Sequence, residues 1–141
     1  MNTTLARELF DYLFKNLHIS DGEDYYLYAL PDSKNTTPNV YWMVPGTETL
    51  IQKNASGEAR YLDTFTINCR SQSSFDADRG ISKAKEIINN IKCISLPHYE
   101  VVYIEATMVR VDNDLDVEGA KRASLTINLR TYGERTTDES S

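Results

Sequence analysis

Apolar residues recur at helical spacing between Ser74 and Lys92, and polar residues take the opposite side of the same segment. The apolar positions are Ala77, Ile81, Ala84, Ile88 and Ile91, and Ile87 widens the stripe. Ser73 or Ser74 can cap the start, and two aspartates follow in the first turn, where the helix dipole favours anions. The pattern predicts a helix over 74–92, packed on a sheet because strand patterns precede and follow it.

A second helix is predicted near the start of the chain, over Thr4–Leu17. Leucines recur there every four residues, with further apolar residues beside them: Leu5, Leu9, Leu13, Leu17, Ala6, Phe10 and Phe14. An apolar face this broad requires a partner surface, in this subunit or in another.

Segments rich in β-branched and aromatic residues predict strands between and after the helices. They cover residues 25–30, 40–44, 61–70, 101–111 and 123–132, and a further short strand is expected at 49–52, after a stop at Pro45-Gly46. Residues 61–70 alternate cleanly between apolar and polar side chains. Phe65, Ile67 and Cys69 are expected to be buried, and the opposite face is expected to meet solvent or an interface through Thr64, Thr66, Asn68 and Arg70.

Two further strand features lead to specific expectations. Residues 65–70 (FTINCR) and 125–130 (LTINLR) share one alternation, with apolar side chains expected on the helix side and Thr, Asn and Arg on the other. The polar faces of the two segments could therefore lie side by side in one sheet. In the segment 101–111 the apolar parity changes after Met108, which predicts either a β-bulge near that residue or a strand buried on both faces at its far end. Before the change, Val102, Ile104, Ala106 and Met108 are expected to share a face, and after it Val109 and Val111 are expected to take the other parity.

The predicted order α-β-β-β-α-β-β gives an α+β domain with a mixed, mostly antiparallel sheet and helices packed on one face. The strands at 61–70 and 101–111 are expected to be parallel, joined by a right-handed crossover, and the last strand is expected to be antiparallel to its predecessor. We expect one domain over residues 1–133. The polar segment 134–141 has nothing to bury and is expected to be disordered.

The bulky run Tyr41-Trp42-Met43 has two interpretations. It can be ordinary half-buried sheet, or an exposed aromatic patch that meets a partner.

Composition restricts the classes of function. The chain has 141 residues and a net charge of −6, which argues against a nucleic-acid binder because phosphate contacts need Lys and Arg. The start of the chain lacks the pattern of a signal peptide, and no apolar run is long enough to cross a bilayer, so the protein is expected to stay in the cytoplasm where it is made. Cys69 continues an apolar strand face, and we expect a buried free thiol there rather than a disulfide to Cys93.

The segment Asp112, Asp114, Asp116 and Glu118 places carboxylates at alternate positions, a spacing that calcium loops use. A calcium loop counted from Asp112 lacks its glycine at Val117 and its bidentate glutamate at Ala123, so a solvated hairpin loop, or a loop displayed on an assembly surface, is the preferred interpretation. His18 and His98 have no carboxylate or thiol at ligand spacing in the sequence. Serine-hydrolase and nucleotide-binding motifs are absent. We therefore expect no metal, no cofactor and no catalysis.

The whole pattern is similar to the tail terminator (tail completion) proteins of long-tailed bacteriophages, including those named minor capsid proteins in phages of Gram-positive bacteria. The resemblance covers roughly residues 5–133. It rests on the N-terminal helix, the strand ending in Val44-Pro45-Gly46, the segment 62–73 (LDTFTINCRSQS) that leads into the helix, and the closing segment 125–132 (LTINLRTY).

The resemblance implies a structural protein that forms a hexameric ring on the end of the tail tube, ends its polymerisation and joins the tube to the head connector. It implies a place in the tail neck of the virion after assembly in the host cytoplasm, with DNA passing through the ring without sequence-specific binding. The candidate contact residues are Asp112, Asp114, Asp116 and Glu118 in the acidic loop and Thr64, Thr66, Asn68 and Arg70 on the polar strand face, with the loop 32–39 as a further candidate. The alternatives are a head-side neck or connector protein, and a small acidic domain that binds a metal or a ligand.

Overall fold

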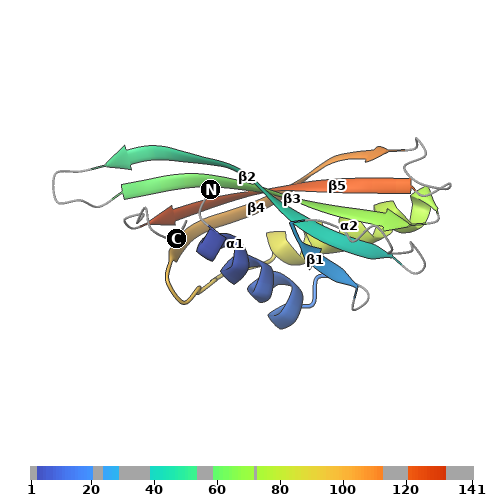
Figure 1. Ribbon diagram of the computed structural model, residues 1–141, viewed down its shortest axis with the longest axis horizontal. Helices are drawn as coiled ribbons and strands as arrows, with labels where there is room; N and C mark the ends of the chain where they lie inside the picture. Colours follow the sequence, from blue (N-terminus) through green and yellow to red (C-terminus); the bar gives the residue numbers. More distant parts are fainter. Residues whose placement is uncertain are drawn as a thin grey trace.

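One sheet of five strands forms the frame of the part of the molecule that the structure describes (Figure 1). The computed structural model describes residues 3–20, 24–28, 39–53, 59–71, 73–112 and 121–132. The strands are β1 (Tyr25–Leu27), β2 (Val40–Lys53), β3 (Ala59–Ser71), β4 (Glu100–Asp112) and β5 (Lys121–Tyr132). Their order is β1-β2-β3-β5-β4; β1 runs parallel to β2 and all other neighbouring pairs are antiparallel. The predicted α+β class and the mixed, mostly antiparallel sheet are confirmed.

The helices α1 (Thr3–Phe10) and α2 (Ser74–Asn89) lie on the same side of this sheet (Figure 1). The start of α2 is as predicted, because the Ser73 hydroxyl accepts a hydrogen bond of 3.0 Å from the backbone N–H of Asp76. The helix ends three residues before the predicted Lys92, and the chain then runs toward β4. Figure 1 shows α2 lying under the half of the sheet that contains β3, β4 and β5.

One hydrophobic core fills the space between the helices and the sheet. The alternating apolar residues of β3 and β5 are completely buried, as are the apolar residues of α2 that face them: Phe65, Ile67, Cys69, Leu125, Ile127, Leu129, Ala77, Ile81, Ala84 and Ile88. Ile91 and Ile104 are half-buried and pack against the rim of this core. The alternation in the sequence therefore predicted correctly which residues of β3 and β5 face the core.

The N-terminal helix differs from the prediction in its second half. After Phe10 the chain continues as a π-helical segment, η1 (Asp11–Asn16), in which the N–H of Leu17 bonds to the carbonyl of Tyr12 at 3.0 Å. The leucines of this segment recur every four residues, which is longer than the 3.6 residues of one α-helical turn. The wider π-helical turn matches this longer repeat and keeps Leu13 and Phe14 buried. The sequence repeat thus indicated the buried face correctly but not the type of helix.

The prediction that a strand stops at Pro45-Gly46 was wrong, because β2 continues from Val40 to Lys53 with a register irregularity between Pro45 and Glu48. β1 covers the outer edge of β2 only along 41–43, so Pro45 lies where its missing N–H costs no ladder hydrogen bond to a described strand. Gly46 is required by packing, since a Cβ there would lie 2.5 Å from Oγ1 of Thr64.

β4 contains the predicted bulge, since its register against β5 shifts between Met108 and Arg110. A second shift, between Val101 and Tyr103, was not predicted, and it places Val102 at 56% exposure instead of on the buried face. β3 and β4 run in the same direction, as expected, but they are not neighbours because β5 lies between them and is antiparallel to both.

Candidate interaction surfaces

The polar faces of β3 and β5 lie side by side, as the similar segments in the sequence suggested. Thr66 lies opposite Thr126, and Asn68 lies opposite Ser124, on the face of the sheet away from the helices. We call this the outer face, and its β3 positions include the predicted contact residues Thr64, Thr66, Asn68 and Arg70. Their side chains are half-buried or, for Asn68, buried at 9% exposure.

The outer face is held together by contacts within the chain. The Ser124 hydroxyl donates a hydrogen bond of 2.8 Å to Oδ1 of Asn68. Oγ1 of Thr64 accepts a hydrogen bond of 2.8 Å from the backbone N–H of Thr47 and lies 2.9 Å from the Thr47 hydroxyl. These side chains are therefore fixed in place before any partner arrives, which favours a preorganised surface over an adaptable one.

Arginine side chains cover aromatic rings on the same face. The guanidinium carbons lie 5.4, 5.4 and 5.8 Å from the ring centroids in the pairs Arg60–Tyr132, Arg70–Trp42 and Arg130–Tyr103. Tyr103 also donates a hydrogen bond to Glu105, which raises the pKa of its hydroxyl above the ordinary value. Sequence analysis missed these pairs because each joins residues of different strands.

The run Tyr41-Trp42-Met43 is an internal part of the sheet and not an exposed patch. Tyr41 and Met43 are completely buried on the helix side, and Trp42, on the outer side, is 9% exposed beneath Arg70. Of the two interpretations of the sequence, the sheet interpretation is confirmed.

Most of the acidic loop lies outside the described residues, and so do Asp114, Asp116 and Glu118. The structure describes the backbone of Asp112, which is the last residue of β4 and lies opposite Arg122 of β5. In the other candidate loop, 32–39, only Asn39 is described. It is buried, and its side chain donates a hydrogen bond of 3.3 Å to the carbonyl of Asp76. The assignment of these loops as contact surfaces stays a prediction, as does that of the polar tail at 134–141, which also lies outside the described residues.

Histidine and carboxylate meet at one place that the sequence did not suggest. Glu8 of α1 accepts a hydrogen bond of 3.0 Å from the backbone N–H of His98, and its other oxygen lies 2.5 Å from Nδ1 of the same histidine. The pair has no third ligand: within the described residues, no group of three His, Cys, Asp or Glu side chains could hold a metal ion. We therefore interpret this contact as a tether between α1 and the chain that leads into β4.

An exposed arm is the surface that sequence analysis missed most clearly. Every residue from Gly46 to Lys53 is exposed, and Leu50 and Ile51 retain 49% and 48% of their accessible surface. Figure 1 shows this part of β2 extending with the start of β3 beyond the helices. We call residues 46–53 the β2 arm. Its continuity with the buried half of β2 was hidden in the sequence by Pro45-Gly46.

Comparisons with known proteins identify a chain of similar fold in a large assembly. No family model matches the sequence, and no curated protein matches it either. Among solved structures, a chain from "Virion of native gene transfer agent (GTA) particle" has a TM-score of 0.62 and 13% sequence identity. The similarity covers 86% of this chain and 92% of that chain. At this level of identity the comparison shows that the two chains share a fold. In the described residues, no helix is long and apolar enough to span a membrane.

Proposed function

We propose that the protein is a structural component of a virion, and within that class a tail terminator of a long-tailed bacteriophage. The observation that carries the proposal is the shared fold with a chain of a virion particle, which extends over nearly the full length of both chains. The independent resemblance of the sequence to tail terminator proteins points to the same class.

The features of the described surface agree with a binding role. The polar side chains of the outer face are engaged in hydrogen bonds and arginine–aromatic contacts, and the β2 arm exposes apolar side chains. Surfaces of this kind serve recognition through shape, buried apolar area and charge complementarity. We propose that no reaction is catalysed and that no cofactor takes part.

In this proposal the protein forms a hexameric ring on the end of the finished tail tube. One face of the ring binds the tail tube protein and stops its polymerisation, and the opposite face binds the head connector. Each subunit carries a net charge of −6, so the ring is strongly acidic. An acidic channel does not bind phosphate, which allows the genome to slide through. The protein then resides in the tail neck after assembly in the host cytoplasm.

The test is made in the phage whose genome encodes the chain. Loss of the protein should give overlong tail tubes and tails without heads in electron micrographs, and antibody labelling of complete virions should mark the tail neck. The purified protein should bind the ends of polymerised tail tubes. Tubes of normal length that join heads in the absence of the protein would contradict the proposal.

The same experiment separates the tail terminator from a head-side connector. A head-side protein should bind portal complexes and not tail tubes, and its loss should leave tails of normal length beside heads that leak DNA. Binding to neither assembly, with normal virion yield, would remove the protein from the neck altogether.

A further inference from the structure

A groove runs along the outer edge of β4, at the opposite edge of the sheet from the β2 arm. It has a volume of about 580 Å³, and it is lined by the end of α2, the following residues 91–94 and the strand residues 101–106. β4 is the last strand of the sheet, so its outer backbone edge faces no other described strand. An edge strand beside an open groove is the geometry that accepts an added strand.

Two contacts mark the limits of this open edge. At one end the side chain of Asn89 pairs with the backbone of Ala106 in both directions, donating to its carbonyl at 2.9 Å and accepting from its N–H at 2.8 Å. At the other end Ser95 forms an isolated antiparallel bridge with Glu100. Along a strand, the backbone N–H and C=O groups of successive residues point alternately to the two sides. The groups of Ile104 therefore point away from β5, as those of Ala106 do. They face the groove between the two contacts.

The β2 arm and the open edge of β4 lie at the same level of the sheet. The pairing register places Leu50 opposite Tyr61, Tyr61 opposite Thr131, and Thr131 opposite Val101. Along the arm, beyond Met43, no described strand pairs with the outer edge of β2. The two edges are thus at matching heights on opposite sides of one subunit.

The strand directions also match. β2, β3, β5 and β4 are successive antiparallel neighbours, so β2 and β4 run in opposite directions. A second copy that is rotated about an axis close to the strand direction would present its β2 antiparallel to β4 of the first copy. Antiparallel pairing is slightly the more stable arrangement per residue.

We propose that the groove along β4 binds the β2 arm of a second copy of this chain, which adds to the sheet as an antiparallel strand next to residues 101–104. The contact uses a different surface on each partner, so its repetition generates a ring when the rotation closes. The proposal rests on the proposed function in one respect, because it takes the partner to be another subunit of the same ring. It adds to that function the surfaces through which neighbouring subunits bind each other.

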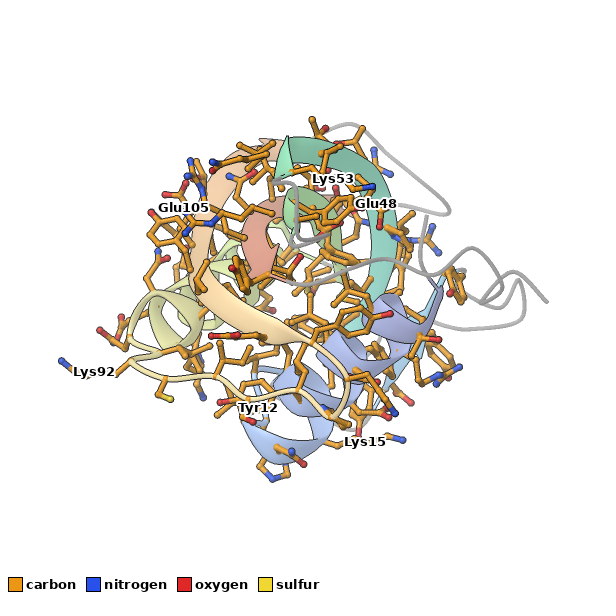
Figure 2. The ribbon with its side chains drawn as sticks, turned by 90° about the vertical axis from the view of Figure 1, so that its left-hand side faces the viewer. Tyr12, Lys15, Glu48, Lys53, Lys92 and Glu105 are labelled. Carbon is orange, nitrogen blue, oxygen red and sulfur yellow. The ribbon has the colours of Figure 1, made fainter. Side chains whose placement is uncertain are left out.

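The side chains of the two surfaces fit each other. Leu50 and Ile51 on the arm are half exposed in the single subunit, and so are Val102 and Tyr103 on the edge of β4. Pairing the strands would remove part of this apolar area from water. The arm carries Glu48 and Lys53, and the groove carries Lys92 and Glu105, so each surface has one charge of either sign; Figure 2 shows the first two residues on one side of the molecule and the other two on the opposite side. The match between the two surfaces therefore rests on their apolar side chains and on the strand register, and not on charge.

Cysteine cross-linking tests the proposal on the purified full chain. Cys93 lies in the groove and is exposed, whereas Cys69 is buried. A tagged variant with Ile51→Cys and Cys93→Ser is mixed at high concentration with the unchanged protein, and a short bifunctional maleimide is added. The expected main product joins the Cys introduced at position 51 of one copy to Cys93 of the other, identified by mass spectrometry of the linked peptides.

Matched substitutions show whether the contact is specific. Leu50→Lys in the tagged variant should lower the yield of this product roughly tenfold, as expected when a contact loses one buried leucine. Phe75→Lys, at a residue that is 67% exposed on α2 and away from both edges, should leave the yield unchanged. Circular dichroism confirms that each variant is folded before the reaction.

Three results would overturn the proposal: a predominant link between two Cys93 residues, which indicates that two β4 edges meet; a predominant link between two arms; or no product that depends on concentration. The readout is made on purified protein, independently of tail assembly. Failure of the cross-link leaves the neck function standing, and failure of the neck function leaves the arm-to-groove contact standing as a mode of self-association.

Discussion

Glu8 on the first helix binds His98 twice, through the backbone N–H at 3.0 Å and through the imidazole Nδ1, across a separation of 90 residues. The Glu8 side chain is only 9% exposed, whereas that of His98 is 72% exposed. The contact fixes the segment between α2 and β4 against α1. It therefore also fixes the approach to the open edge of β4, where the next subunit is proposed to bind.

Replacing Glu8 by Ala should lower the free energy of unfolding by about 1–3 kcal/mol, because a buried carboxylate that accepts two hydrogen bonds is lost. His98→Ala removes only the side-chain contact and should cost less. Both are measured by urea denaturation, with Glu86→Gln on the exposed side of α2 as the control. Equal losses for the two alanine variants would show that the backbone hydrogen bond contributes nothing.

Ile88→Ala should cost about 2–5 kcal/mol, because Ile88 is completely buried between α2 and the sheet. The comparison is Ile51→Ala on the β2 arm, where the side chain is 48% exposed and the cost in the isolated subunit should be far smaller. A loss below about 0.5 kcal/mol for Ile88→Ala would mean that α2 does not pack as described.

Gly46→Ala should destabilise the protein by about 1–3 kcal/mol, because the added methyl group would lie 2.5 Å from Oγ1 of Thr64. The same oxygen binds Thr47, so the clash would also disturb the start of the arm. Adding Thr64→Ala should recover part of the loss, and only part, since the carbonyl of Thr64 lies 3.0 Å from the same position. A double-mutant cycle measures this coupling, and strictly additive losses would contradict it.

The local pattern of apolar and polar residues was sufficient to predict the core and most of the sheet. Phe65, Ile67 and Cys69 alternate with polar residues, and a period of two determines which side of a strand is buried. The bulge near Met108 was predictable for the same reason, because an extra residue changes the parity of the side chains.

Features that depend on distant parts of the chain were not predictable in this way. The continuation of β2 through Pro45 depends on which strands pair with its two edges, and the outward turn of Val102 depends on a register shift against β5. The contact of Glu8 with His98, the arginine–aromatic pairs and the groove along β4 each join segments that only the tertiary fold brings together. Of the candidate site, the sequence predicted the polar face of β3 but not the two sheet edges.

The acidic loop is the candidate contact surface that a functional experiment must test. Changing Asp112, Asp114, Asp116 and Glu118 together to Asn or Gln removes four charges from a chain whose net charge is −6. Folding should be preserved, because substitutions in polar loops are usually within about 0.5 kcal/mol of neutral, and the melting temperature provides the control. If the loop lines the channel or meets a basic patch on a neighbour, the variant should give overlong tails or tails that fail to join heads. A fully folded variant that supports normal virion yield would remove this loop from the functional surface and leave the outer face, the loop 32–39 and the two sheet edges as the remaining candidates.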